Sequence, residues 1–266
     1  MSLYRKMAHW ATAAATGAAL TLMAAPAGAA PVSATAKYVV SLAGVNVAGV
    51  SIDFADDGSS YKIDVGANVS GVGTLVASGT AQAESSGRSG KDMLTAREFD
   101  LETRTRDESF NVAVQYASGN ATGFQINPPL INNIDRIAIE RKHLQRVTDP
   151  LGSYILKGDA LEPALCDRRL KVFTGVERYD IAMNFVQAET ATSNRTGYQG
   201  PVVLCQLRYI PVAGHFTTSE MTTYLANSNR ILIWYAPLHD SGYFIPYRIL
   251  LGTSAGDLSM VLTGLD

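Results

Sequence analysis

The most regular feature of this chain is an alternation of apolar and polar residues with a period of two. The alternation is clearest over residues 61–67, 110–116 and 179–185. Each segment places its apolar side chains on one face of an extended strand and its polar ones on the other. The apolar positions are Tyr61, Ile63, Val65, Ala67, Phe110, Val112, Val114, Tyr116, Tyr179, Ile181, Met183 and Phe185.

Turn-forming residues separate the alternating segments. They occur at Asp57-Gly58, Ser118-Gly119-Asn120, Thr174-Gly175 and Asp240-Ser241-Gly242, and between Thr253 and Gly256. This spacing predicts about ten antiparallel strands, joined mostly by hairpins.

Two segments with helical spacing interrupt the strands. In the first, Thr148-Asp149-Pro150 has the composition of a helix N-terminus, and Gly158 is placed to end the helix. Leu151, Tyr154 and Ile155 then share one apolar stripe, suited to plugging a curved sheet.

The second predicted helix spans residues 217–227, where Thr217 and Glu220 have the spacing of a capping box. Its apolar side consists of Met221, Tyr224 and Leu225. Both helices are too short to be stable alone, so each is expected to pack against the sheet.

Residues 1–29 have the features of a cleavable signal peptide. Arg5 and Lys6 precede an uncharged, Ala-rich run from Ala11 to Ala25, and Ala27-Gly28-Ala29 matches a signal peptidase site. The run is shorter than the roughly 20 residues of a spanning helix, and an uncleaved anchor is the alternative. No cysteine follows it closely, which argues against a lipoprotein. We expect export to the periplasm and a single β-rich domain over residues 30–266, with no transmembrane segment after cleavage.

The two cysteines, Cys166 and Cys205, are expected to form one structural disulfide, because exported proteins oxidise paired cysteines. They are not a Cys-x-x-Cys redox motif, and no His accompanies them at metal-ligand spacing. The chain has 22 basic and 24 acidic residues and a net charge of −2. It lacks the concentrated basic patch that a nucleic-acid partner needs.

No catalytic motif survives comparison with the structural context that it requires. Residues 252–256 match the Gly-x-Ser-x-Gly spelling of a nucleophile elbow, but no His follows Ser254 and a strand is predicted next. A hairpin turn is the better interpretation. Asp53, Asp57 and Asp64 match some positions of a calcium loop that lacks its terminal Glu, and a β-turn explains them better. We expect no cofactor, no metal site and no enzymatic activity.

One block of sequence around the two cysteines is distinctive. Its elements are Cys166, Leu170-Lys171-Val172-Phe173-Thr174-Gly175, Arg178-Tyr179-Asp180, Tyr198-Gln199-Gly200-Pro201, Cys205 and Pro211-Val212-Ala213-Gly214-His215, with Asp149-Pro150-Leu151 before it. This block resembles the domain of unknown function 3108 family (DUF3108) of exported bacterial envelope proteins. The resemblance runs from about Tyr38 to Leu265. Thr174 departs from the family pattern, which has Asp before the turn glycine.

The resemblance implies a mainly β fold. A curved antiparallel sheet, a half-barrel or β-spiral similar to the periplasmic lipoprotein carriers, would wrap around one or two short helices. Our leading hypothesis is a non-catalytic envelope protein that binds a lipid or lipoprotein in the concave face of this sheet, by analogy of fold. The residues expected there are Leu151, Tyr154, Ile155, Trp234 and Tyr235, with plain core packing as the alternative for each.

Two other functions are open. A structural or scaffolding protein would bind an envelope protein or the cell wall through its edge strands, and it predicts a filled interior and an exposed apolar patch. A hydrolase, which we favour less, would need a polar site assembled in space from Asp149, Arg178 and His215.

Overall fold

The computed structural model describes residues 30–69, 79–130, 134–253 and 255–266. The predicted signal peptide, residues 1–29, lies outside this part of the chain, and so does Ser254.

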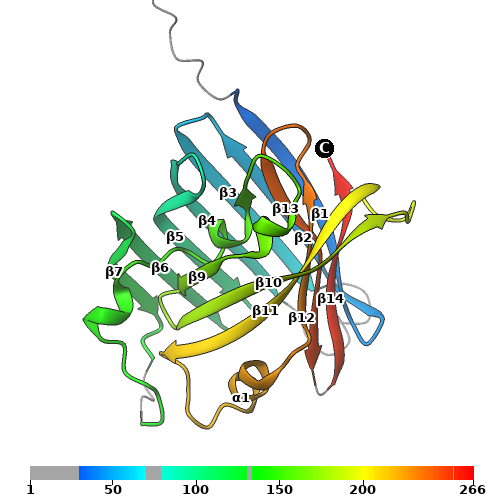
Figure 1. Cartoon of the computed structure of the whole chain (residues 1–266). Coiled ribbons are helices and arrows are strands. Elements are labelled where there is room, and N and C mark those ends of the chain that lie inside the picture. The colour runs from blue at the N-terminus through cyan, green and yellow to red at the C-terminus, as the bar shows by residue number, and fades with distance from the viewer. Residues whose placement is uncertain (1–29, 70–78, 131–133, 254) are drawn as a thin grey trace, which may run out of the picture.

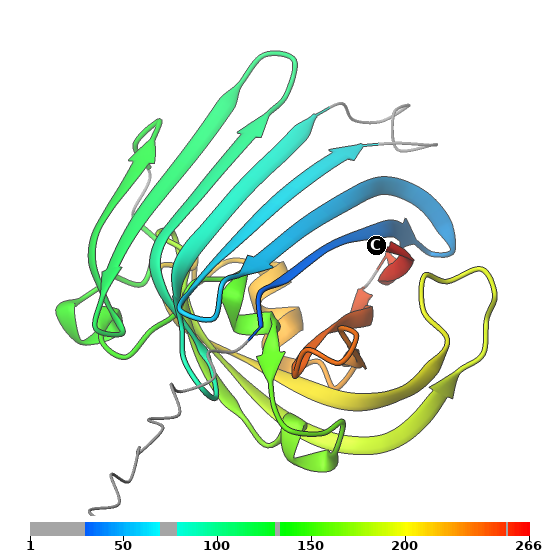
Figure 2. The same ribbon diagram turned by 90° about the horizontal axis from the view of Figure 1, so that it is seen from above.

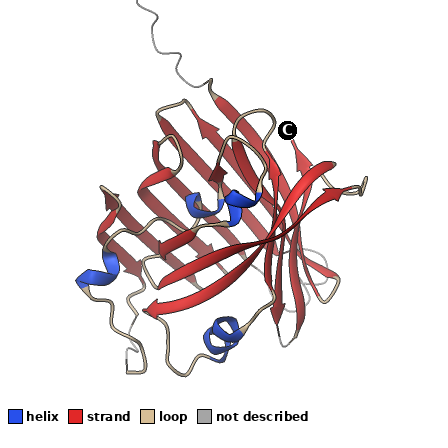
Figure 3. Ribbon diagram, viewed as in Figure 1, coloured by secondary structure: helices blue, strands red, loops and turns tan. Residues whose placement is uncertain are grey.

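β-Strands make up most of the described chain (Figures 1 and 3). The predicted alternation is confirmed, for example, in β3, where Tyr61 and Ile63 are buried and Lys62 is exposed. The strands are β1 (Val32–Leu42), β2 (Val45–Asp56), β3 (Ser60–Val69), β4 (Thr80–Ser89), β5 (Leu94–Arg104), β6 (Ser109–Ala117), β7 (Asn120–Asn127), β8 (Leu156–Lys157), β9 (Arg169–Phe173), β10 (Arg178–Ala191), β11 (Gly200–Ala213), β12 (Ile231–Pro237), β13 (Tyr243–Thr253) and β14 (Gly256–Leu265).

These strands form a 14-stranded antiparallel sheet. Its order is β7-β6-β5-β4-β3-β2-β1-β14-β13-β12-β11-β10-β9, and the short β8 pairs with β13. Neighbours in the sheet mostly follow the order of the chain, as hairpin connections require. The exceptions are the pair of β8 and β13 and the pair of β1 and β14, which joins the two halves of the sequence. The prediction of about ten strands was too low, because strands such as β4 carry few large apolar residues.

The sheet rolls up into a nearly closed, barrel-like shape (Figure 2). Viewed from above, β1–β7 lie on one side and β10–β11 on the opposite side. The end strands of the sheet order are β7 and β9. They meet through side chains, since the rings of Phe124 in β7 and Phe173 in β9 pack edge to face with centroids 5.2 Å apart. We call the region where these two end strands approach each other the seam.

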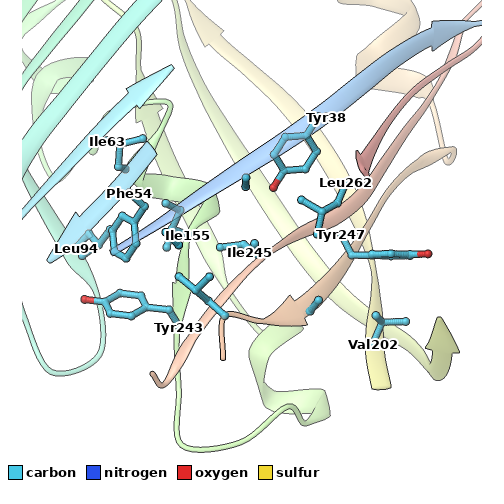
Figure 4. Packing of buried hydrophobic residues seen from close by; sticks show 14 of the residues in the cluster. Tyr38, Phe54, Ile63, Leu94, Ile155, Val202, Tyr243, Ile245, Tyr247 and Leu262 are labelled. Carbon is cyan, nitrogen blue, oxygen red and sulfur yellow. The ribbon is translucent and has the colours of Figure 1, made fainter. Parts of the chain in front are cut away.

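Three apolar clusters form the core of the protein. The first joins β1–β3 to β12–β13 and contains Tyr38, Phe54, Tyr243, Ile245 and Leu262 (Figure 4). The second surrounds the disulfide. The third lies along the seam, where Phe173 of β9 packs against residues of β5 and β6. Burial of each large side chain contributes about 1.5–3 kcal/mol to the free energy of folding.

The first predicted helix is absent as such. Gly152–Tyr154 form a single 3-10 turn, η3, and the next residues form β8. The prediction of a helix between Pro150 and Gly158 was wrong because Leu156 and Lys157 pair with Phe244 and Tyr243 of β13. Tertiary pairing overrides the local helical spacing here.

The second predicted helix exists but starts later. α1 spans Glu220–Asn227, and its N-cap is Ser219, whose hydroxyl accepts a hydrogen bond from the Thr222 amide at 3.1 Å. The predicted cap at Thr217 was wrong. The expected packing through Met221 was also wrong, since this side chain is 55% exposed. Two further 3-10 turns are η2 (Arg141–Leu144) and η4 (Pro163–Cys166).

The predicted disulfide is present. Cys166 of η4 and Cys205 of β11 are bonded, their Cα atoms are 5.4 Å apart, and both residues are fully buried. One prediction on β10 fails nearby, because Phe185 is 40% exposed. A register shift between Phe185 and Gln187 breaks the alternation at that point.

Candidate functional site

The apolar cavity enclosed by the first core cluster is small. An apolar cavity between β1, β2 and β13 measures about 30 Å³. Its walls include Tyr38, Phe54, Ile155 and Ile245, which belong to the first core cluster. A cavity of this size holds about one water molecule and is far below the several hundred Å³ of a ligand pocket.

The predicted ligand-binding residues at η3 are part of this packing. Ile155 is 8% exposed and belongs to the first core cluster, and Leu151 packs against both the first cluster and the one at the seam. Tyr154 packs against the cluster around the disulfide. The three side chains therefore contact different parts of the core rather than sharing one stripe.

Trp234 and Tyr235 are neighbours in β12, so their side chains point to opposite faces of the strand. Tyr235 is fully buried in the cluster around the disulfide, and burial raises the pKa of its hydroxyl. The indole of Trp234 donates a hydrogen bond to Glu189 at 3.0 Å, and the guanidinium of Arg248 lies 5.1 Å from its ring centroid. The two side chains therefore have different surroundings.

The polar residues predicted to converge have separate surroundings. Asp149 is fully buried, and its carboxylate accepts hydrogen bonds from the Leu151 and Gly152 amides at 2.8 and 2.7 Å. It thereby fixes the start of η3. Burial raises the pKa of this carboxyl.

Arg178 lies in β10, is 5% exposed and forms an ion pair with Asp180 at 2.6 Å. His215 lies in the predicted turn between a strand and α1, and its carbonyl accepts a hydrogen bond from the Ile137 amide at 3.0 Å. Among the described residues, no hydrogen bond or ion pair connects Asp149, Arg178 and His215 with one another.

The structure instead forms an apolar groove at the seam, about 430 Å³ in volume. We call it the seam groove. Its lining residues are Phe124, Ile126, Pro129, Leu130, Arg136, Ile137, Ala138, Ile139, Gly175, Val176 and Gly214. The side chains of Phe124 and Ile137 on its rim are 40% and 38% exposed. Exposed apolar surface of this kind is typical of binding sites.

One wall of the seam groove is the turn between β9 and β10. Gly175 has a φ of +86°, and a Cβ atom there would lie 2.4 Å from Val112 Cγ1. Only glycine combines this backbone conformation with such close approach to β6. Thr174, where the resemblance led us to expect Asp, stabilises the turn, because its hydroxyl accepts hydrogen bonds from the amides of Val176 and Glu177 at 3.3 and 3.0 Å.

The opposite wall is a segment held by Arg136. Its guanidinium donates to the carbonyls of Gly214 and Val176 at 2.7 and 2.8 Å, and it lies 5.4 Å from the ring centroid of Phe216. The Gly214 amide donates to the carbonyl of Ile137 at 2.8 Å. The charge is thus used to fix the wall, and the groove stays apolar.

A second pocket, of about 340 Å³, opens at the end of β8 and is polar. Lys157 Nζ donates to Ser89 Oγ at 2.8 Å and to the Gly90 carbonyl at 2.7 Å. Ser89 and Tyr243 donate in turn to the buried carboxylate of Asp56. Burial lowers the pKa of Lys157, while the nearby Asp56 carboxylate opposes that shift. No sequence motif predicts this cluster, because its residues lie on four separate strands.

A third groove, of about 610 Å³, runs across β2–β7 and is acidic. Asp64, Glu84 and Asp100 lie directly opposite one another on adjacent strands. The ammonium of Lys62 forms ion pairs with the carboxylates of Asp64 and Glu84 at 2.9 and 3.1 Å. In the described part of the chain, no group of three or more His, Cys, Asp or Glu residues is arranged to hold a metal ion.

The fold and the seam define a class of barrel-like β proteins that are stapled by a disulfide and not closed by strand pairing. The chain belongs to the DUF3108 family, described as protein of unknown function, whose model matches residues 37–263. The predicted resemblance is thus confirmed. No curated protein matches the chain in sequence.

One solved structure has a similar fold. It is the crystal structure of a beta-barrel-like protein of domain of unknown function DUF1849 from Brucella abortus. The TM-score is 0.52 with 10% sequence identity, over 88% of this chain and 97% of that chain. At this identity the likeness shows the fold alone. In the part of the chain that the structure describes, no helix is long and apolar enough to cross a membrane.

Proposed function

We propose that this protein is a non-catalytic binding protein of the bacterial cell envelope, which docks an envelope protein in the seam groove. The observation that carries the proposal is the combination of a packed interior with an exposed apolar groove. This is the combination expected for the scaffolding hypothesis. Export to the periplasm is part of the proposal and is supported by the sequence of residues 1–29 and by the buried disulfide.

The alternative of a lipid inside the sheet has less support. A cavity of about 30 Å³ is smaller than an acyl chain of ordinary length, which occupies several hundred Å³. Of the residues expected to contact the lipid, Ile155 and Tyr235 are buried in the apolar clusters, and Leu151, Tyr154 and Trp234 pack against these clusters. The seam groove has room for an acyl chain as well, so both ligands can be tested at the same place.

In-cell photo-crosslinking at the seam groove tests the proposal. A benzophenone side chain is placed at Ile126, which lines the groove, and in a matched control at Gln125, its exposed neighbour on the other face of β7. We expect one discrete protein adduct from position 126 and none from position 125. The purified adduct partner should bind the wild-type protein at least about tenfold more tightly than Val176→Asp.

Three results contradict this function. If mass spectrometry finds a lipid and no protein crosslinked to position 126, the seam groove binds a lipid instead of a protein. If both positions give equal adducts, the partner does not bind specifically in the seam groove. The same conclusion follows if the partner binds Val176→Asp as tightly as the wild type.

A further inference from the structure

The edge of β7 at the seam groove is unprotected. An edge strand presents unpaired amides and carbonyls, and proteins usually shield such edges with charges, prolines or a covering segment. Residues 120–127 contain no charged residue and no proline. Among the described residues, the backbone of Thr122–Asn127 makes hydrogen bonds with β6 and with no other segment.

The other end strand, β9, is covered. Thr148 forms an isolated parallel β-bridge with Val172 of β9. The Thr148 amide donates to the Lys171 carbonyl at 2.8 Å, and the Phe173 amide donates to the Thr148 carbonyl at 3.0 Å. The protein therefore shields one edge at the seam with its own chain and leaves the other available.

The seam groove lies along the inner face of that free edge. Phe124 and Ile126 pair with Val114 and Val112 of β6, so their side chains lie on the face that the core covers. Both also line the groove. A strand added beside β7 would continue this face, and every second side chain of the added strand would enter the groove.

We propose that the seam groove takes an extended polypeptide segment, which adds a strand to β7 and buries alternate apolar side chains. This inference rests on the proposed function and names the form of its partner. Backbone hydrogen bonds supply the affinity in such strand addition, and the pockets for alternate side chains supply the specificity. Because the lining is apolar and the charge of Arg136 is engaged, the buried positions of the segment are uncharged.

A generic peptide tests the inference, because backbone pairing does not depend on sequence. The probe is a soluble peptide of about nine residues that alternates valine with threonine, and its control has N-methyl groups on consecutive central amides. Methylation leaves the side chains unchanged and blocks both edges. We expect the unmethylated peptide, at up to about 1 mM, to slow amide hydrogen exchange in residues 122–127, and the methylated one to have no effect.

Protein variants locate the effect. Phe124→Asp, in the groove, should abolish the exchange protection, and Gln125→Asp, on the opposite face of the same strand, should keep it. Circular dichroism spectra that match the wild type show that both variants are folded.

The outcomes separate the inference from the proposed function. Equal binding of both peptides, with loss in Phe124→Asp, would overturn strand addition and keep the groove as a binding surface. Absence of exchange protection by either peptide at about 1 mM overturns strand addition as well, while a crosslinked partner at position 126 would leave the function intact.

Discussion

The Nζ atom of Lys157 lies 2.8 Å from the Oγ atom of Ser89, so the short β8 is tied to the end of β4. The same ammonium is 3.9 Å from the carboxylate of Asp56, which is 4% exposed, and 4.6 Å from the ring centroid of Tyr243. The ammonium of Lys157 in β8 thus contacts residues of β2, β4 and β13. This cluster fixes the segment that leads from η3 into the disulfide region.

Replacing this cation by an isosteric apolar side chain should destabilise the fold. We expect Lys157→Met to lower the free energy of unfolding by about 2 kcal/mol, because Asp56 and Ser89 lose a charged partner in a mostly buried site. Urea unfolding measures the change. Lys91→Met, at an exposed lysine beside the same pocket, is the matched control and should change stability by less than about 0.5 kcal/mol. Equal effects of the two substitutions would contradict a structural role of the cluster.

Asp149 should make stability depend on pH in the acid range. Burial raises the pKa of its carboxyl above the ordinary 3.8, so the folded state holds the proton more tightly than the unfolded state. Its contribution therefore favours folding increasingly as the pH falls through the raised pKa. Asp149→Asn keeps an acceptor for the Leu151 and Gly152 amides and does not titrate. The stability of the wild type relative to Asp149→Asn should rise between about pH 7 and pH 4 in urea unfolding.

The control for this experiment is Asp107→Asn, which removes an exposed carboxylate. Its stability relative to the wild type should stay nearly constant over the same range. A flat difference for Asp149→Asn would show that its carboxyl titrates alike in both states.

The disulfide should contribute a large share of stability. It closes a loop with a sequence separation of 39, which corresponds to about 4 kcal/mol on the chain-entropy model. The double variant Cys166→Ala/Cys205→Ala should lose about this amount in urea unfolding. A reductant should have a similar effect on the wild type and none on the variant. A loss below about 1 kcal/mol would mean that the loop is already ordered in the unfolded chain.

Much of the fold follows from local sequence. The period-two pattern predicted strands such as β3, β6 and β10, and the turn residues predicted hairpins such as the one between β6 and β7. The prediction of a helix between Pro150 and Gly158 was wrong because Leu156 and Lys157 pair with β13, and local sequence does not show this tertiary contact. The apolar pattern of this segment fits both the predicted helix and the observed turn. In either structure Leu151, Tyr154 and Ile155 pack against the core.

The candidate site was less accessible to sequence reasoning. Phe124 and Ile126 have the pattern of any half-buried strand, and nothing in their sequence states that β7 is the end of the sheet order. The seam groove depends on that order and on the turn at Gly175, far away in sequence. The cluster of Lys157, Ser89 and Asp56 was missed for the same reason. The absence of charges from β7 was the one signal in the sequence, and it has meaning only once the strand order is known.

Gly175 should be the most sensitive backbone position of the seam groove. A methyl group at this position would lie 2.4 Å from Val112 Cγ1 and 2.9 Å from Val114 Cγ2, in addition to the strain of its φ of +86°. Gly119 is a matched control, with a φ of +73° and no atom within 4 Å of an added Cβ. Gly119→Ala should cost about 1 kcal/mol from backbone strain alone, and Gly175→Ala about 2–4 kcal/mol, because the turn must move away from β6. Urea unfolding gives both values, and equal losses would show that β6 yields to the added methyl group without cost.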